Sequence, residues 1–144
     1  MAEQTIKQGG VVFGARFDEN WEVKHDYTET IDGVSVFRGS KYVQSKTGDT
    51  FKQAEQFLKQ NRKVLFSGTP CQIVALKRYL KKEYENLLLV DFICHGVPSP
   101  GVWRKYLKQV IALTCDKNTV SSHLKLLLSE RNALVEGISF RDKR

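Results

Sequence analysis

The sequence has little of what marks membrane and secreted proteins. No apolar run exceeds four residues, as at 87–90, so no segment is long enough to cross a bilayer. Residues 1–10 contain no apolar stretch of the kind that signal peptides require. The three cysteines are an odd number and include no closely spaced pair. Their number and spacing argue against a disulfide scaffold and a zinc finger, and they indicate a protein of the reducing cytoplasm.

The charge of the chain is no more specific. The formal net charge is +7 at pH 7, but the basic residues are scattered and accompany no nucleic-acid-binding motif. We therefore expect a soluble basic domain with no nucleic-acid partner; the alternative is a basic face toward an anionic cofactor or an acidic protein. With 144 residues, 41% of them hydrophobic and 27% charged, the chain has the composition of one globular domain.

The middle of the chain has the pattern of a β-α-β unit. Residues 63–67 and 87–94 are short apolar runs that predict buried strands, and 71–82 has the apolar spacing of a helix. Nearer the N-terminus, residues 11–17 and 21–25 predict two strands joined by a tight turn. We therefore expect an α/β fold with a mixed, partly parallel sheet flanked by helices, an N-terminal β hairpin and a central β-α-β unit.

The remaining segments are less regular. We expect a helical turn at 2–8, a polar connection at 26–36, a loop at 37–45, helices at 49–61 and 99–113, a weaker helix at 119–129 and a last strand at 135–141. Residues 1–144 are expected to form a single α/β domain. Because the first helical turn is too short to stand alone and the last strand has no closing element, we also expect a piece of a longer chain.

Two cysteines are the main candidates for a functional site. In a β-α-β unit the strands run parallel, so residues beyond their carboxyl ends meet at one edge of the sheet. Cys71 follows the first predicted strand and Cys94 ends the second. Cys71 also lies in the first turn of its helix, where the partial positive charge favours a thiolate. Gly68 permits close approach of a ligand to the backbone. The spacing alone is equally compatible with two buried structural cysteines.

The third cysteine and the histidines carry weaker signals. Cys115 lies in a polar turn after a helix, and we expect it to be incidental. His25 alternates along a strand and is expected to be exposed, and His123 is expected on a helix surface. His95, directly after Cys94, is the histidine that we regard as a candidate site residue.

Four stretches occur in a set order along the chain. They are GGVVFGARF at 9–17, RGSKYVQS at 38–45, SGTPCQ at 67–72 and DFICHGVPSP at 91–100. With the closing ISFRDKR, they resemble the coenzyme F420 hydrogenase/dehydrogenase β-subunit family. Each stretch alone is weak, but four in order at matching spacing are specific. The resemblance covers nearly the whole chain except about residues 112–134.

The resemblance implies part of a flavin- and iron–sulfur-dependent oxidoreductase subunit. Such subunits bind FAD and 4Fe-4S clusters and exchange electrons with a redox partner subunit or a small electron carrier. Cys71 and Cys94 match cluster ligands. The residues that match the flavin site are Gly39, Ser40, Lys41, Tyr42, Gln44, Gly68 and Thr69. The resemblance puts Lys41 near the flavin ring or its phosphates, where a cation stabilises the anionic reduced flavin.

The chain departs from the family pattern in its cysteines. It lacks the ferredoxin-like Cys-x-x-Cys-x-x-Cys region, and a 4Fe-4S cluster takes four thiolates. We therefore expect neither a complete cluster nor activity in these residues alone. Two other hypotheses stay open. One is a non-catalytic binding or assembly module of the same fold, and the other is a thiol enzyme with Cys71 as nucleophile and His95 as base.

Overall fold

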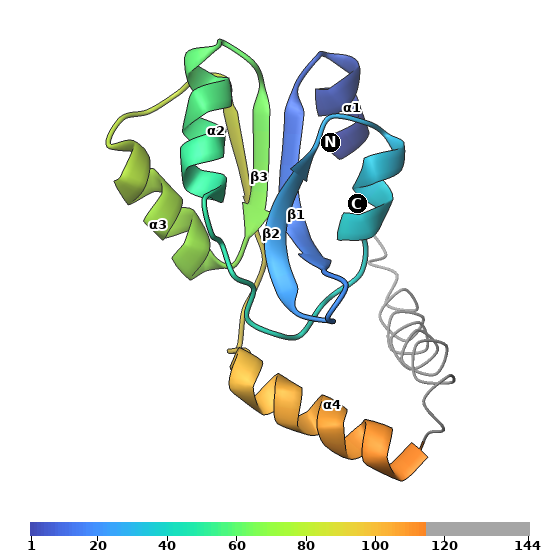
Figure 1. The fold of residues 1–144 in the computed structure, drawn as a ribbon. Helices are drawn as coiled ribbons and strands as arrows, with labels where there is room; N and C mark the ends of the chain where they lie inside the picture. Colours follow the sequence, from blue (N-terminus) through green and yellow to red (C-terminus); the bar gives the residue numbers. More distant parts are fainter. Residues whose placement is uncertain (115–144) are drawn as a thin grey trace, which may run out of the picture. The chain divides into compact units, whose positions relative to one another are not determined.

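The chain folds as a sheet with helices packed on both of its faces (Figure 1). The computed structural model describes residues 1–114. The elements are α1 (Ala2–Lys7), β1 (Val11–Phe17), β2 (Val23–Thr28), the 3-10 helix η1 (Asp32–Phe37), α2 (Thr50–Lys59), β3 (Val64–Gly68), α3 (Pro70–Leu80), β4 (Leu87–Asp91) and α4 (Pro100–Thr114). Residues Met1–Pro100 form one compact unit that carries the sheet, and α4 from Gly101 onward belongs to a second unit.

The strands follow the order β2-β1-β3-β4 across the sheet. β1 and β2 form an antiparallel hairpin. Its turn is closed by Asp18, whose Oδ1 accepts the N–H groups of Asn20 and Glu22, each at 2.9 Å. β1 pairs with β3, and β3 pairs with β4, in parallel. The predicted hairpin, the mixed sheet and the central β-α-β unit are therefore confirmed.

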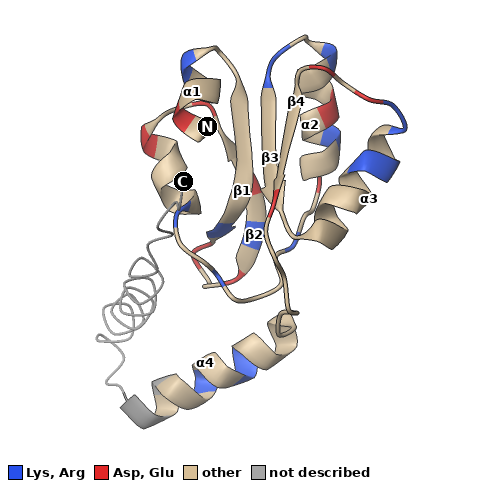
Figure 2. Cartoon of the chain, turned by 180° about the vertical axis from the view of Figure 1, so that it is seen from behind, with Lys and Arg blue, Asp and Glu red and all other residues tan. Residues whose placement is uncertain are grey.

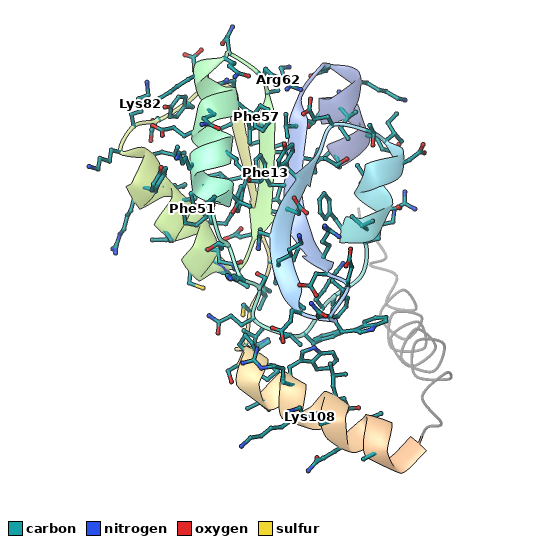
Figure 3. The ribbon with its side chains drawn as sticks, viewed as in Figure 1. Phe13, Phe51, Phe57, Arg62, Lys82 and Lys108 are labelled. Carbon is teal, nitrogen blue, oxygen red and sulfur yellow. The ribbon has the colours of Figure 1, made fainter. Side chains whose placement is uncertain are left out.

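The main core lies between the sheet and helices α2 and α3. Apolar residues that alternate along the strands and recur every three to four positions along the helices meet there: Val11, Phe13, Ala54, Leu58, Val64, Phe66, Ile73, Leu76 and Leu80. Aromatic rings run through this core. The ring centroids of Phe13 and Phe66 lie 5.3 Å apart. Those of Phe13 and Phe57, both labelled in Figure 3, lie 6.2 Å apart. Because α3 packs in this core, the turn that joins β3 to α3 is held in a fixed position.

The opposite face of the sheet carries α1 and η1. A Cβ atom added to Gly14 would lie 2.9 Å from Cγ of Phe37, so the glycine allows η1 to pack directly on β1. The edge strand β4 is less well covered than β1, since the side chain of Leu88 is 46% exposed. Lysine and arginine residues are spread over the helices and loops and interspersed with acidic ones in the described part of the chain (Figure 2). No helix within residues 1–114 is long and apolar enough to cross a membrane.

Two predictions about the strands were wrong in detail. The second hairpin strand continues to Thr28, into the predicted polar connection. The strand predicted at 87–94 ends at Asp91, and it is a partly exposed edge strand and not a buried one. The cause is the register: Asp91 pairs with Gly68, the last residue of β3, so residues beyond it have no parallel partner. The helix predicted at 119–129, the strand predicted at 135–141, Cys115 and His123 lie outside the described residues.

Candidate functional site

The two candidate cysteines follow equivalent positions of neighbouring parallel strands. Gly68 ends β3 and pairs with Asp91, which ends β4. Cys71 and Cys94 each come three residues after those paired positions. Both thiols are free, with Cys71 exposed and Cys94 partly exposed. The register therefore puts both cysteines just beyond the carboxyl edge of the sheet, where open α/β sheets bind ligands.

Cys71 is held in a capped helix start. Pro70 is the first residue of α3, and Thr69 and Gln72 form a capping box around it. In that box the Thr69 N–H donates to Oε1 of Gln72 at 3.0 Å. The Thr69 hydroxyl lies 3.1 Å from the Cys71 sulfur, within hydrogen-bond distance. The cysteine is therefore placed by a turn whose own geometry depends on the side chain of Gln72.

A buried histidine extends this arrangement across the sheet. His25 on β2 is 5% exposed, and its ring stacks on Phe66 with centroids 5.4 Å apart. Its Nε2 lies 3.0 Å from the Ser67 carbonyl oxygen, and its Nδ1 lies 2.8 Å from the Ser45 hydroxyl. The Ser45 hydroxyl also accepts a hydrogen bond from Nε2 of Gln72 at 2.8 Å. A continuous polar network thus joins β2, the end of β3, the loop before α2 and the start of α3.

The donors in this network can be assigned. A carbonyl oxygen can only accept, so Nε2 of His25 carries a proton and donates to Ser67. In the neutral ring Nδ1 is then an acceptor, and the Ser45 hydroxyl donates to it. Burial lowers the pKa of the His25 imidazole below its ordinary 6.5, and the hydrogen bond with Ser67 opposes part of that effect. His25 is therefore neutral at neutral pH.

The prediction that His25 is exposed was wrong. Residues two apart on a strand point to the same face, and Val23 on that face is buried as well. This spacing was the signal in the sequence that could have placed the histidine inside. Ser45 and Gln72 lie within the motif stretches, but the sequence analysis gave them no role.

The loop at 38–46 is anchored at two further points. Its end pairs with the edge of the sheet: the Lys46 N–H donates to the Val23 carbonyl, and one parallel bridge forms between Lys24 and Lys46. The Gln44 N–H donates to the Pro98 carbonyl at 3.2 Å. The second, third and fourth motif stretches, far apart in the sequence, are therefore joined by hydrogen bonds at the carboxyl edge of β3 and β4.

Four of the predicted flavin-site residues are consecutive in this loop. Gly39 and Tyr42 have positive φ angles of 78° and 49°, and Ser40 and Tyr42 are exposed. The Lys41 ammonium donates to the carbonyls of Arg38 and Gly39 at 2.7 and 2.9 Å. Burial lowers the pKa of Lys41 to about 8. Within residues 1–114 no carboxylate forms an ion pair with this lysine, so a partly desolvated cation stands beside the edge.

Gly68 has close neighbours on the side where a side chain would project. A Cβ atom there would lie 3.1 Å from Oε1 of Gln72 and 3.5 Å from Nε2 of His25. The space is thus filled by the polar network itself, so the glycine permits His25 and Gln72 to approach the backbone of β3.

The described residues offer only part of an iron–sulfur site. A 4Fe-4S cluster takes four thiolates, and residues 1–114 supply the two thiols of Cys71 and Cys94. In this part of the chain no three histidine, cysteine or acidic side chains are grouped so that they could hold a metal ion. His95 is exposed and forms no hydrogen bond with Cys71 in the described structure, and Cys115 lies outside it.

Comparison with known proteins agrees with the motif resemblance. A search of curated proteins gave no match. A scan against family models matched residues 61–123 to the family described as the C terminus of the coenzyme F420 hydrogenase/dehydrogenase beta subunit. The match begins just before β3 and includes the whole β3-α3-β4 unit with Cys71 and Cys94. Over residues 61–123, the chain is thus similar to the C-terminal domain of the coenzyme F420 hydrogenase/dehydrogenase beta subunit.

Proposed function

We propose that this chain is part of an electron-transfer subunit that uses FAD and a 4Fe-4S cluster. The observation that carries the proposal is the meeting of three motif stretches at one sheet edge, with Cys71 and Cys94 after the paired positions that end β3 and β4. Two exposed or partly exposed thiols at such an edge suit a redox cofactor better than a structural core role.

In this proposal Cys71 and Cys94 are two ligands of the cluster. The remaining thiolates would come from cysteines other than Cys115 in the full-length protein or its partner, since the described part of the chain has only these two. The turn that bears Cys71 is rigidly capped, and the Thr69 hydroxyl beside its sulfur can donate a hydrogen bond to a thiolate. Hydrogen bonds to cluster sulfurs tune the potential of such centres.

The flavin would lie against the loop at 38–46. Gly39, Ser40, Tyr42 and Gln44 present backbone and polar groups there, with Gly68 and Thr69 beside them, and Lys41 supplies a positive charge without a carboxylate partner among the described residues. When bound, FAD supplies hydride or electron transfer. Lys41 would hold the anionic phosphates or stabilise the anionic reduced ring.

The protein would work in the reducing cytoplasm with a redox partner subunit or a small electron carrier. The family match supports a subunit role, because the matching family is described as a beta subunit. Three cysteines without a disulfide framework support the location.

Anaerobic reconstitution of the full-length protein with FAD, iron and sulfide tests the proposal. We expect a yellow-brown protein that retains flavin and iron after desalting. A colourless, folded protein would overturn it and favour the binding or assembly module. Catalysis that is lost on alkylation of Cys71 but needs neither flavin nor metal would favour the thiol enzyme instead.

A further inference from the structure

The buried network around His25 has no part in the proposed cofactor chemistry. Its members come from four separate segments: β2, the loop before α2, the end of β3 and the start of α3. His25 is buried and the other members are partly buried, and such a polar network specifies one arrangement when all its members are satisfied. The donors and acceptors assigned above satisfy each of them in a single direction.

We infer that His25 is a positioning residue that couples the loop at 38–46 to the turn bearing Cys71. The neutral ring carries its hydrogen on Nε2, so its Nδ1 accepts a hydrogen bond from the Ser45 hydroxyl. This bond orients the Ser45 hydroxyl so that its oxygen accepts a hydrogen bond from the Gln72 amide. The Gln72 amide is then oriented with its oxygen on the Thr69 N–H, beside Cys71. This inference does not rest on the proposed flavin or iron binding.

Among the described residues, the groups that contact the His25 ring carry no negative charge that would balance a positive charge on it. Phe66 covers one face of the ring, and the Ser67 carbonyl and Ser45 hydroxyl occupy its two nitrogens. Both of these partners are uncharged, so neither compensates a positive charge on the ring. The nearest charged residues on its own strand, Lys24 and Asp26, pair with each other at 3.5 Å on the other face of β2.

Protonation of His25 would reverse one bond of the network. Nδ1 would then carry a hydrogen, so the Ser45 hydroxyl could no longer donate to it and would have to turn its own proton elsewhere. The Ser45 oxygen would then accept from both Nδ1–H and the Gln72 amide, so the direction of the Gln72 hydrogen bond would change and with it the way the loop at 38–46 holds the turn. The Cys71 turn would therefore depend on a group on β2, which is two strands away from β3 in the sheet.

An NMR titration of the isotope-labelled chain over mildly acidic pH tests the coupling. In the wild type, the Thr69 amide and the Gln72 side-chain amide should shift with the same midpoint as the His25 ring. In Ser45→Ala these two signals should lose that midpoint, although His25 remains beside Gly68. Ser45→Thr, which keeps a hydroxyl, should restore it. Ser35→Ala, which removes an exposed serine hydroxyl on η1, is the matched control and should behave as wild type.

A second measurement tests whether the protonation of His25 affects the reactivity of the Cys71 thiol. The alkylation rate of Cys71 in the wild type, divided by that in Ser45→Ala, should change in a step at the His25 midpoint. The same ratio for Cys94 should stay constant with pH.

Three results would overturn the inference. The first is a neutral His25 ring with its proton on Nδ1 in the wild type, which needs no variant to detect. The second is a Thr69 signal that still follows His25 in Ser45→Ala. The third is a Gln72 side-chain amide signal in the wild type that does not shift as His25 titrates. This result would overturn the inference even if Ser45→Ala does not fold.

Discussion

Replacing His25 with phenylalanine should lower stability at neutral pH and remove a pH dependence. The phenyl ring keeps the stacking on Phe66, so the change isolates the two hydrogen bonds of the imidazole. Leaving the Ser67 carbonyl and the Ser45 hydroxyl without that partner costs about 1–3 kcal/mol for each group that finds no substitute. The greater hydrophobicity of phenylalanine offsets part of the loss. We expect a net loss of about 1–3 kcal/mol in the free energy of unfolding.

The pH dependence follows from the lowered pKa of His25. Above pH 6.5 the ring is neutral in both the folded and the unfolded chain, so it contributes no slope. Below pH 6.5 His25 becomes protonated in the unfolded chain but stays neutral in the folded chain. The free energy of unfolding therefore falls with decreasing pH until the pKa of His25 in the folded chain is reached. The loss amounts to about 1.4 kcal/mol for each unit by which burial lowers the pKa. The variant lacks this loss, so its deficit relative to wild type should shrink as the pH falls.

Urea unfolding of both proteins between about pH 7 and pH 5 measures this, since the carboxylates are still ionised over most of that window. The m-values should agree, and the gap between the midpoints should narrow toward pH 5. A gap that stays constant would refute the claim that His25 is buried and neutral.

Three further predictions concern packing and the cation at the edge. Leu76→Ala should cost about 2–5 kcal/mol in urea unfolding because Leu76 is fully buried, whereas Val74→Ala on the exposed side of the same helix should cost far less. Gly10→Ala should lower the thermal midpoint by several degrees, because its Cβ would lie 2.7 Å from the Lys63 carbonyl; an unchanged midpoint would contradict this packing. Lys41→Gln should weaken FAD binding in titrations without moving the unfolding midpoint, and equal FAD affinity would remove Lys41 from the proposed site.

The β-α-β unit was predictable because its signals are local. β3 and β4 are apolar runs, and the turn between β3 and α3 combines a glycine, a capping threonine and a proline at the first helical position. The end of β4 was not predictable from the same kind of signal. The apolar side chains of Phe92 and Ile93 continue the run, but the chain leaves the sheet after Asp91 because β3 offers no further partner.

The polar network could not be predicted because it is non-local. The spacing from Val23 could have indicated that His25 is buried, but its partner Ser45 is brought to it by the loop at 38–46, which folds back along the edge of β2, where the Lys46 N–H donates to the Val23 carbonyl. Nothing in the strand around His25 indicates that loop. The position of Cys71 was predictable, since it needs only the strand, the turn and the helix that follow one another in the chain.

The iron content of cysteine variants tests the central claim, that Cys71 and Cys94 serve one redox centre at the sheet edge. Full-length wild type, Cys71→Ser, Cys94→Ser and the control Cys115→Ser would be reconstituted anaerobically, and iron and sulfide would be measured per chain. We predict that Cys71→Ser and Cys94→Ser each lose the same cluster, while Cys115→Ser keeps it. Full iron in both edge variants, with their folds intact, would contradict the account.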